Sequence, residues 1–417
     1  MDNNMMAYLE WAGAQEMAQL PFNEVDALAL SQVVYLPLEE AMEAVEKLPF
    51  WLLMTAMQHV KAEKVYEYLL RQRLALLERM GGLPRYKHQV VSRFVDEISL
   101  EDQMQFSAMT VDLPGGVRAL CYRGTDSSLV GWKEDFNMGF ESPVPAQRAA
   151  LEYLRQAAAQ CAGPLLLLGH SKGGNLAVYA AAFAEEALQQ RIQAVYSFDG
   201  PGLAEELAAD PGYDRVHDRI LSYLPQGSMV GILLAQHKPY QVVSSAGIGP
   251  FQHDAFNWEV EPQAGRFVYL QERTLFSRAM EESVHTWLRS LSLEDRQLFS
   301  NTIYEILTAA DDRHLAELMT PSRQRASKLW EAYRSVPPDV REGLLQALGS
   351  LLGGTLGGAL SGVAQSVRDR IIDLLPDRFS RTKEALPEGE EAQEDSGDGP
   401  AADGQGDSVQ PPASTEQ

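Results

Sequence analysis

The pattern of apolar and polar positions divides the chain into stretches with different periods. Residues 1–85 place apolar side chains at helical spacing, as in EVDALALSQVVYL, and this pattern stops at the Gly-Gly and Pro of residues 81–84. From residue 106 short β-type runs follow, SAMTVDL and VRALCYRG, which a Pro-Gly-Gly sequence joins as a hairpin. Helical spacing returns from 276 to 334. The pattern predicts helical regions at both ends of a central region that contains strands.

The central region alternates strands with helices. The leucine run that begins at residue 165 is apolar enough for a strand buried on both faces, and helices are predicted before it, at 145–160, and after it, at 175–184. Alternation of this kind predicts an α/β fold whose sheet is mainly parallel and covered on both faces. Further strands are predicted at 193–200, 219–225 and 240–245.

We therefore expect five parts along the chain. They are a helical N-terminal extension packed on the core (1–85), an α/β core (86–275), a helical C-terminal region (276–340), a Gly-rich helical segment (341–380) and a disordered acidic tail (381–417).

The amino-acid composition limits the classes of binding partner and the cellular compartment that we expect. The formal net charge of -23 argues against nucleic acid as a partner, although ten acidic residues and one lysine between 383 and 417 supply much of it. Two cysteines are too few for a disulfide framework, and no Cys/His spacing typical of a metal site is present. The first residues show neither a basic nor an apolar leader pattern, so we expect a cytoplasmic protein. No protein partner can be identified from the sequence.

Residues 343–367 carry no charge and repeat glycine at intervals of four. This spacing lets helices approach closely, as in membrane-embedded pairs, so one interpretation is a self-associating helix or a peripheral membrane contact. The other is a Gly-rich linker or a helix that packs on the soluble domain, because glutamine, serine and threonine interrupt the run and glycine weakens helices in water.

The most informative motif follows the leucine run. Gly169-His170-Ser171-Lys172-Gly173 matches G-x-S-x-G between a predicted buried strand and a helix of small residues. Such a turn would expose the Ser171 hydroxyl as a nucleophile, while the two glycines leave room for strand and helix to approach. The backbone N–H of Lys172, at the start of the helix, would face an oxyanion. The alternative is a tight turn without chemistry.

A serine nucleophile needs a base, and the order for this motif is Ser, then Asp or Glu, then His. His253 lies in the loop GIGPFQHDAF, after the last predicted core strand, where an imidazole could reach the serine. His237 is the reserve candidate.

The acid is Asp199 in our interpretation, because it follows the strand next to the nucleophile and would lie at the same edge of the sheet. It could instead only cap a Gly-Pro-Gly turn. The other carboxylates that could serve are Asp214, Asp218 and Asp254.

A second oxyanion donor is expected after an earlier strand. Thr125, in YRGTDSS, could offer both its backbone N–H and its hydroxyl. The apolar side chains that follow could form a lid, an acyl-contact surface or part of the core: Trp132, Phe136, Met138 and Phe140.

Together, YRGTDSS…GWKEDF, GHSKGGNLA, FDGPG and QHD resemble the class 3 lipases, the fungal triacylglycerol lipase type of α/β-hydrolase, and more closely a bacterial lipase-like (Mbeg-like) family. The resemblance covers residues 23–260. It implies an α/β-hydrolase fold, Ser171 as nucleophile, His253 as base, and Lys172 with Thr125 at the oxyanion hole.

Two positions depart from those lipases. Ser228 stands where they usually carry the acid, so either Asp199 takes over or the triad is a weakened dyad. Lys172 replaces the usual small or apolar residue after the serine. It could favour an acidic substrate such as a phospholipid, or it could be a surface lysine.

The sequence therefore predicts a serine esterase that cleaves lipid or acyl esters through an acyl-enzyme and needs no cofactor. A thioesterase or an amidase would use the same residues. The alternative from another class is a catalytically impaired, lipase-like protein that binds lipid or acts as a scaffold.

Overall fold

The structure is a computed structural model that describes residues 3–43, 45–60, 68–126, 128–309, 323–338 and 340–342. The predicted glycine-rich segment, including 343–367, and the predicted acidic tail lie outside these residues, except for positions 341 and 342. No helix in the described ranges is both long and apolar enough to cross a membrane.

The described residues form an α/β fold around a nine-stranded mixed sheet. The five strands from β4 to β8 run parallel to one another, and the four remaining neighbouring pairs are antiparallel. In sheet order the strands are β1 (Lys47–Pro49), β2 (Val90–Ser99), β3 (Met104–Asp112), β4 (Arg118–Tyr122), β5 (Leu165–His170), β6 (Ile192–Phe198), β7 (Ile220–Pro225), β8 (Gln241–Val243) and β11 (Tyr269–Leu270).

The prediction of a mainly parallel sheet is thus wrong, since half of the neighbouring pairs are antiparallel. The pattern of apolar and polar positions along the sequence did not predict β1, β2 or β11. Strand β2 carries several half-buried or exposed polar positions, so it lacks the continuous apolar run of a central parallel strand. A two-stranded antiparallel sheet, β9 (Val260–Glu261) and β10 (Arg266–Phe267), was also not predicted.

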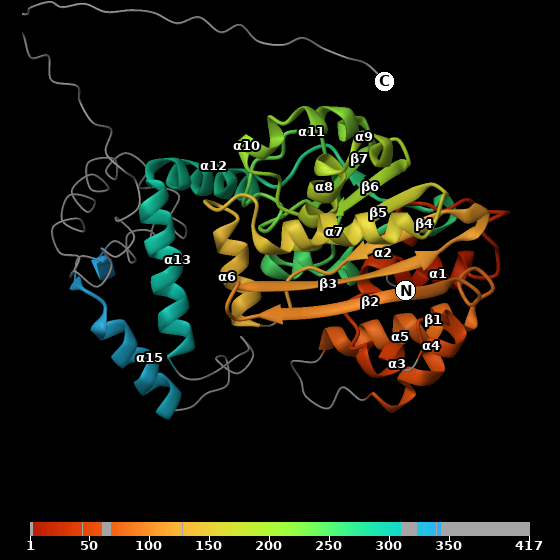
Figure 1. The fold of residues 1–417 in the computed structure, drawn as a ribbon, viewed down its shortest axis with the longest axis horizontal. Helices are drawn as coiled ribbons and strands as arrows, with labels where there is room; N and C mark the ends of the chain where they lie inside the picture. The colour runs from red at the N-terminus through yellow and green to blue at the C-terminus, as the bar shows by residue number, and fades with distance from the viewer. Residues whose placement is uncertain are drawn as a thin grey trace, which may run out of the picture. The chain divides into compact units, whose positions relative to one another are not determined.

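Helices cover both faces of the sheet, and β5 shows how its sequence divides between them. Leu166 and Leu168 pack with the N-terminal helices, whereas Leu165 and Leu167 pack with the helices that follow β4. Figure 1 shows the two sets on opposite sides of the sheet. The first set is α1 (Met5–Ala12), α2 (Glu24–Val33), α3 (Glu39–Glu43), α4 (Phe50–Ala56) and α5 (Tyr68–Gly82), and the second is α7 (Pro145–Ala159), α8 (Lys172–Phe183), α9 (Glu186–Gln189), α10 (Glu205–Ala208) and α11 (Pro211–Val216).

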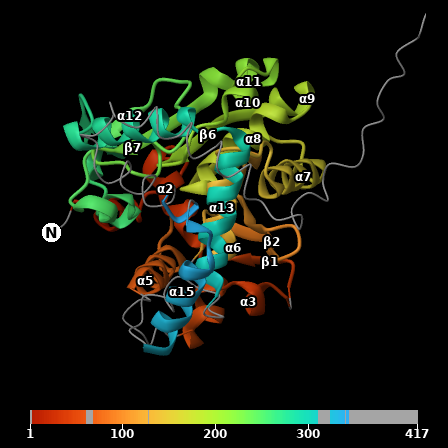
Figure 2. The same cartoon turned by 90° about the vertical axis from the view of Figure 1, so that its left-hand side faces the viewer.

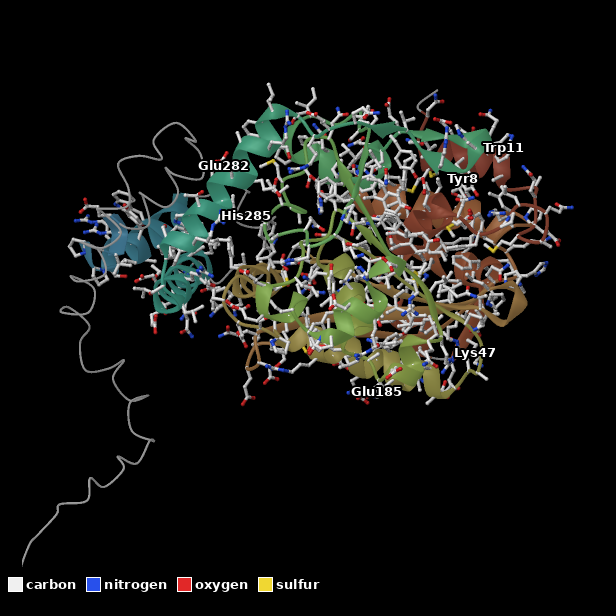
Figure 3. The ribbon with its side chains drawn as sticks, turned by 90° about the horizontal axis from the view of Figure 1, so that it is seen from above. Tyr8, Trp11, Lys47, Glu185, Glu282 and His285 are labelled. Atoms are coloured by element: carbon white, nitrogen blue, oxygen red, sulfur yellow. The ribbon has the colours of Figure 1, made fainter. Side chains whose placement is uncertain are left out.

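A buried ion pair holds the N-terminal helices together. The Asp26 carboxylate accepts hydrogen bonds from Arg85 Nε (2.8 Å), Tyr86 (2.5 Å) and Tyr8 (3.2 Å), and both charged side chains are fully buried. Asn23 caps α2 through a capping box with Asp26. Figure 3 labels Tyr8 on α1.

The C-terminal helices are α12 (Leu275–Ser290), α13 (Leu293–Thr308) and α15 (Arg323–Ser335). Helix α13 packs beside α6 (Leu129–Asn137), as Figures 1 and 2 show. Ser300 Oγ lies 2.9 Å from Asn137 Oδ1, and Arg296 Nη1 donates to the carbonyl of Gly139 (2.9 Å). These contacts fix α6, which carries two of the side chains that surround the candidate site.

Candidate active site

Ser171 occupies the sharp turn between β5 and α8. Its backbone has φ 60° and ψ -136°, a left-handed conformation that costs energy for a residue with a side chain. Its N–H donates to the carbonyl of Phe198 on β6 (2.9 Å). A Cβ atom at Gly169 would lie 2.2 Å from the backbone of Gly173, so the strand and the helix can approach only without side chains there. The positive φ at Ser171 and the close approach at Gly169 are the local features that the predicted nucleophile elbow requires.

Asp199 and His253 lie together at this edge of the sheet. The fully buried Asp199 carboxylate has Oδ2 2.7 Å from His253 Nδ1. Its other oxygen, Oδ1, accepts hydrogen bonds from Ser228 Oγ (2.5 Å) and from the backbone N–H of Gly231 (3.1 Å). Three donors therefore satisfy this buried carboxylate, and Nδ1 of His253 carries the proton that faces it.

His170, the residue before the serine, holds the loop of His253 in place. Its Nε2 donates to the carbonyl of His253 (2.8 Å), and the two rings lie 4.5 Å apart. Burial, followed by the charge of His253, holds the pKa of His170 well below its usual range, so the His170 ring is neutral. The motif thus connects the elbow to the base through a residue that the sequence marked only as part of the turn.

Within the described residues, no hydrogen bond joins the Ser171 hydroxyl to His253, and Nε2 of His253 has no hydrogen-bond partner. Ligand-free hydrolases often show such loose contacts between nucleophile and base. The structure brings the predicted base and acid together and places the elbow beside them.

The reserve candidate His237 and a further downstream histidine, His285, have backbone partners elsewhere. His237 Nε2 lies 2.9 Å from the carbonyl of Leu203. His285, labelled on α12 in Figure 3, has Nε2 2.9 Å from the carbonyl of Ile232.

The alternative acids do not contact His253 Nδ1. Asp214 and Asp218 are exposed, and Asp218 pairs with Lys238 at 3.2 Å. Asp254 accepts a hydrogen bond from the backbone N–H of Phe256 (3.0 Å) at the start of a short 3₁₀ turn. Of the carboxylates considered from the sequence, Asp199 is the one in contact with the imidazole.

Thr125 can offer one oxyanion donor rather than two. Its hydroxyl donates to Asp135 Oδ2 (2.5 Å), and a hydroxyl has a single proton, so its backbone N–H is the donor left for an oxyanion. Burial raises the pKa of Asp135 to about 6, against the lowering influence of Lys172 and of the Thr125 hydrogen bond. The second oxygen of Asp135, Oδ1, is buried and has no hydrogen-bond partner among the described residues.

Lys172 is the first residue of α8, so its backbone N–H has no acceptor within the helix. Its side chain corrects both expectations from the sequence, because it neither lies on the surface nor faces a substrate. It is buried, and Nζ donates to Glu134 Oε2 (2.8 Å), to the Gln105 carbonyl (2.8 Å) and to Gln105 Oε1 (2.9 Å). All three ammonium donors are occupied.

Sequence reasoning missed Tyr35, which follows α2. Its hydroxyl donates to the carbonyl of His170 (3.2 Å) and accepts from the backbone N–H of Gly124 (3.0 Å), so it joins the elbow to the loop of Thr125. Burial raises the pKa of Tyr35 to about 12, so the hydroxyl keeps its proton. No local motif marks this tyrosine, since its partners are distant in the chain.

Comparisons with known proteins add a family. The family model described as Mbeg1-like matches residues 80–305, more than half of the chain. Among solved structures, one described as the crystal structure of M37 lipase matches with 13% sequence identity and a TM-score of 0.32, over 81% of this chain and 99% of that chain. No curated protein matches the chain.

Proposed function

We propose a function for this chain, which belongs to the Mbeg1-like family: it is a serine hydrolase of the α/β-hydrolase fold that cleaves carboxylic esters. The observation that carries the proposal is the contact of 2.7 Å between Asp199 and His253 beside the strained elbow of Ser171. Five parallel strands, with the elbow at the end of the second of these strands, β5, support the fold assignment.

In the proposed reaction, Ser171 Oγ attacks the ester carbonyl while His253 Nε2 accepts the hydroxyl proton. Asp199 keeps the other imidazole nitrogen protonated and stabilises the imidazolium. The backbone N–H groups of Lys172 and Thr125 donate to the oxyanion. The imidazolium then protonates the departing alkoxide. Water repeats the sequence on the acyl-enzyme and releases the acid and free Ser171.

Exposed apolar side chains on two elements that carry residues of the proposed site support an ester with an apolar acyl group. Trp132 and Phe136 are partly exposed on α6, the helix that carries Asp135. Ile248 and Phe251 are strongly exposed in the loop that carries His253. Exposed apolar side chains on two elements of one site are typical of lipid-facing or acyl-facing surfaces.

The alternative is a lipase-like protein that binds lipid without turnover. The missing hydrogen bond between Ser171 and His253 favours this alternative, because an unactivated serine is a weak nucleophile.

A fluorophosphonate probe separates the two, since it labels an activated serine whatever the natural substrate. We expect the wild type to be labelled and Ser171→Ala to remain unlabelled. On p-nitrophenyl esters, His253→Ala should lower turnover by about 10⁶-fold and Asp199→Asn by about 10⁴-fold, as in comparable triads. The matched control is His237→Ala, whose ring bonds a distant carbonyl and should retain activity.

Labelling of the wild type no stronger than that of Ser171→Ala would favour the binding alternative. Turnover of His253→Ala within tenfold of the wild type would remove His253 as the base. A matched thioester and amide extend the test, because a clear preference for the amide would contradict ester hydrolysis as the main activity.

A further inference from the structure

Arg73 on α5 is a partly buried cation that has no acidic partner among the described residues. Its guanidinium carbon lies 4.0 Å from the centre of the Tyr35 ring, and its Nε and Nη2 each lie 3.4 Å from Gln32 Oε1. No carboxylate lies within ion-pair distance of it in the described part of the chain. The four buried arginines of the described ranges each contact a carboxylate: Arg85 with Asp26, Arg118 with Asp112, Arg123 with Asp96, and Arg273 with Glu281. The half-buried Arg93 resembles Arg73, since it contacts an amide oxygen and a ring face, so what distinguishes Arg73 is its place against Tyr35.

A partly desolvated guanidinium with only an amide and a ring face as partners is costly, because buried charges are normally paired. Burial lowers the pKa of Arg73 to about 10, although Tyr35 and Asp254 raise it, so the group is still charged at neutral pH. The repulsive neighbour is Arg123. Asp254 acts on Arg73 from beyond ion-pair distance, so an incoming anion would supply a counter-charge in direct contact.

Tyr35 connects Arg73 to the elbow. The ring beneath the guanidinium carries the hydroxyl that bonds the carbonyl of His170 and the N–H of Gly124. Gly124 lies against the nucleophile, since a Cβ atom there would be 2.8 Å from Cβ of Ser171. Arg73 is therefore separated from the elbow by one side chain.

The charge of Arg73 also acts on the loop of the proposed base. It lowers the pKa of Asp254, the residue after His253, whose pKa burial raises overall. It also contributes to the lowered pKa of His170, after burial and the charge of His253. Because His253 protonates the departing alkoxide in the proposed reaction, the alcohol portion of an ester would lie on the His253 side of the site. Contacts lead from Arg73 to that side, since Arg73 lies on the Tyr35 ring, the Tyr35 hydroxyl donates to the carbonyl of His170, and the His170 ring donates to the carbonyl of His253.

We propose that Arg73 binds an anionic group, a phosphate or sulfonate oxyanion, on the alcohol portion of the ester. This inference rests on the proposed ester hydrolysis and specifies its substrate class. A planar guanidinium matches two oxygens of such a group, whereas the ammonium of Lys172 is fully occupied by Glu134 and Gln105.

Two aryl acetates test the proposal: 4-acetoxybenzenesulfonate, with an anionic leaving group, and 4-nitrophenyl acetate, which is neutral. The measured quantity is the ratio of kcat/KM for the anionic ester to that for the neutral one. Comparing this ratio between variants cancels the intrinsic reactivity of the esters. Arg73→Gln should lower the ratio by tenfold or more, mainly through KM, as expected for losing a hydrogen bond to a charged group. Arg73→Lys should restore part of it.

Arg71→Gln is the matched control, because Arg71 is exposed on the same helix, and its ratio should equal that of the wild type. Added salt should lower the wild-type ratio by screening the pair. Turnover of the neutral ester by Arg73→Gln shows that the variant is folded.

An equal ratio in the wild type and Arg73→Gln would overturn the role of Arg73 and leave ester hydrolysis standing. If the wild type hydrolyses neither ester and takes up no fluorophosphonate, the proposed function fails, and the proposal for Arg73 fails with it.

Discussion

Replacing Asp135 by Asn should stabilise the protein at neutral pH but not at acidic pH. Asp135 accepts the hydroxyl proton of Thr125 through Oδ2, while its buried Oδ1 has no partner among the described residues. Burial is the largest cause that raises the pKa of this carboxyl to about 6. Asparagine keeps the shape and can still bond the Thr125 hydroxyl, but it has no charge to desolvate.

The direction and the size of this change in unfolding free energy follow from the pKa of Asp135 in the folded and in the unfolded chain. In the unfolded chain the pKa is about 3.9, and below it the carboxyl is protonated in both states, so ionisation costs nothing. As the pH rises toward 6, the unfolded chain loses its proton first, and the folded state loses about 1.4 kcal/mol of stability per pH unit. The loss totals about 3 kcal/mol by pH 7, and Asp135→Asn should remove it.

The assay is urea unfolding of the wild type and Asp135→Asn at intervals from pH 4 to pH 8. The unfolding free energy of Asp135→Asn should exceed that of the wild type by close to zero at pH 4 and by about 3 kcal/mol at pH 7. The pKa of about 6 already includes the influence of Lys172, Glu134 and His253 on the Asp135 charge, so the expected difference needs no separate contribution from them. Asp214→Asn, an exposed carboxylate, is the control and should run parallel to the wild type. Parallel curves for Asp135→Asn as well would refute the reasoning.

Two further predictions concern the groups that hold the site together. Ser228→Ala removes one of the two donors to Asp199 Oδ1 and should lower kcat on esters about tenfold. Ser228→Thr keeps the hydroxyl and should have a kcat near that of the wild type. Equal kcat values for all three proteins would show that Ser228 does not position the acid. Lys172→Met leaves Glu134 buried without its cation and should cost about 3–5 kcal/mol in urea unfolding, against less than about 1 kcal/mol for Arg155→Met in the exposed pair with Glu185. Comparable losses in the two variants would contradict a buried ion pair.

The sequence revealed features whose causes are local. The leucine run of β5 alternates between the two cores, so burial on both faces was visible as an uninterrupted apolar stretch. The elbow was visible because its backbone approach excludes any side chain at Gly169, which leaves a signature within five residues. The sheet edge that carries Asp199 was also predicted, because strands that alternate with helices run parallel and end at the same edge.

Features that depend on distant pairing were not visible. The antiparallel half of the sheet was missed because β2 is only partly buried and mixes polar with apolar positions. Strand position favoured Asp199 as the acid but left Asp214, Asp218 and Asp254 open, because the contact of 2.7 Å with His253 joins residues 54 apart in the chain. Ser228, noted only as the absence of an expected acid, donates to the carboxylate that takes the acid's place.

Lys172 and Arg73 show most clearly that features with distant partners cannot be predicted from the local sequence. A lysine next to the serine suggested either a surface lysine or a cation that faces substrate. Its partners Gln105 and Glu134 instead lie 67 and 38 residues away in the chain and occupy its three protons. Arg73 carried no motif, and it lacks such an acidic partner in the described structure. Sequence position therefore cannot tell a structural cation from a ligand-binding one, because the distinction depends on which carboxylates the fold brings within reach of each. For this reason the measured preference for anionic esters should follow Arg73 and not Lys172.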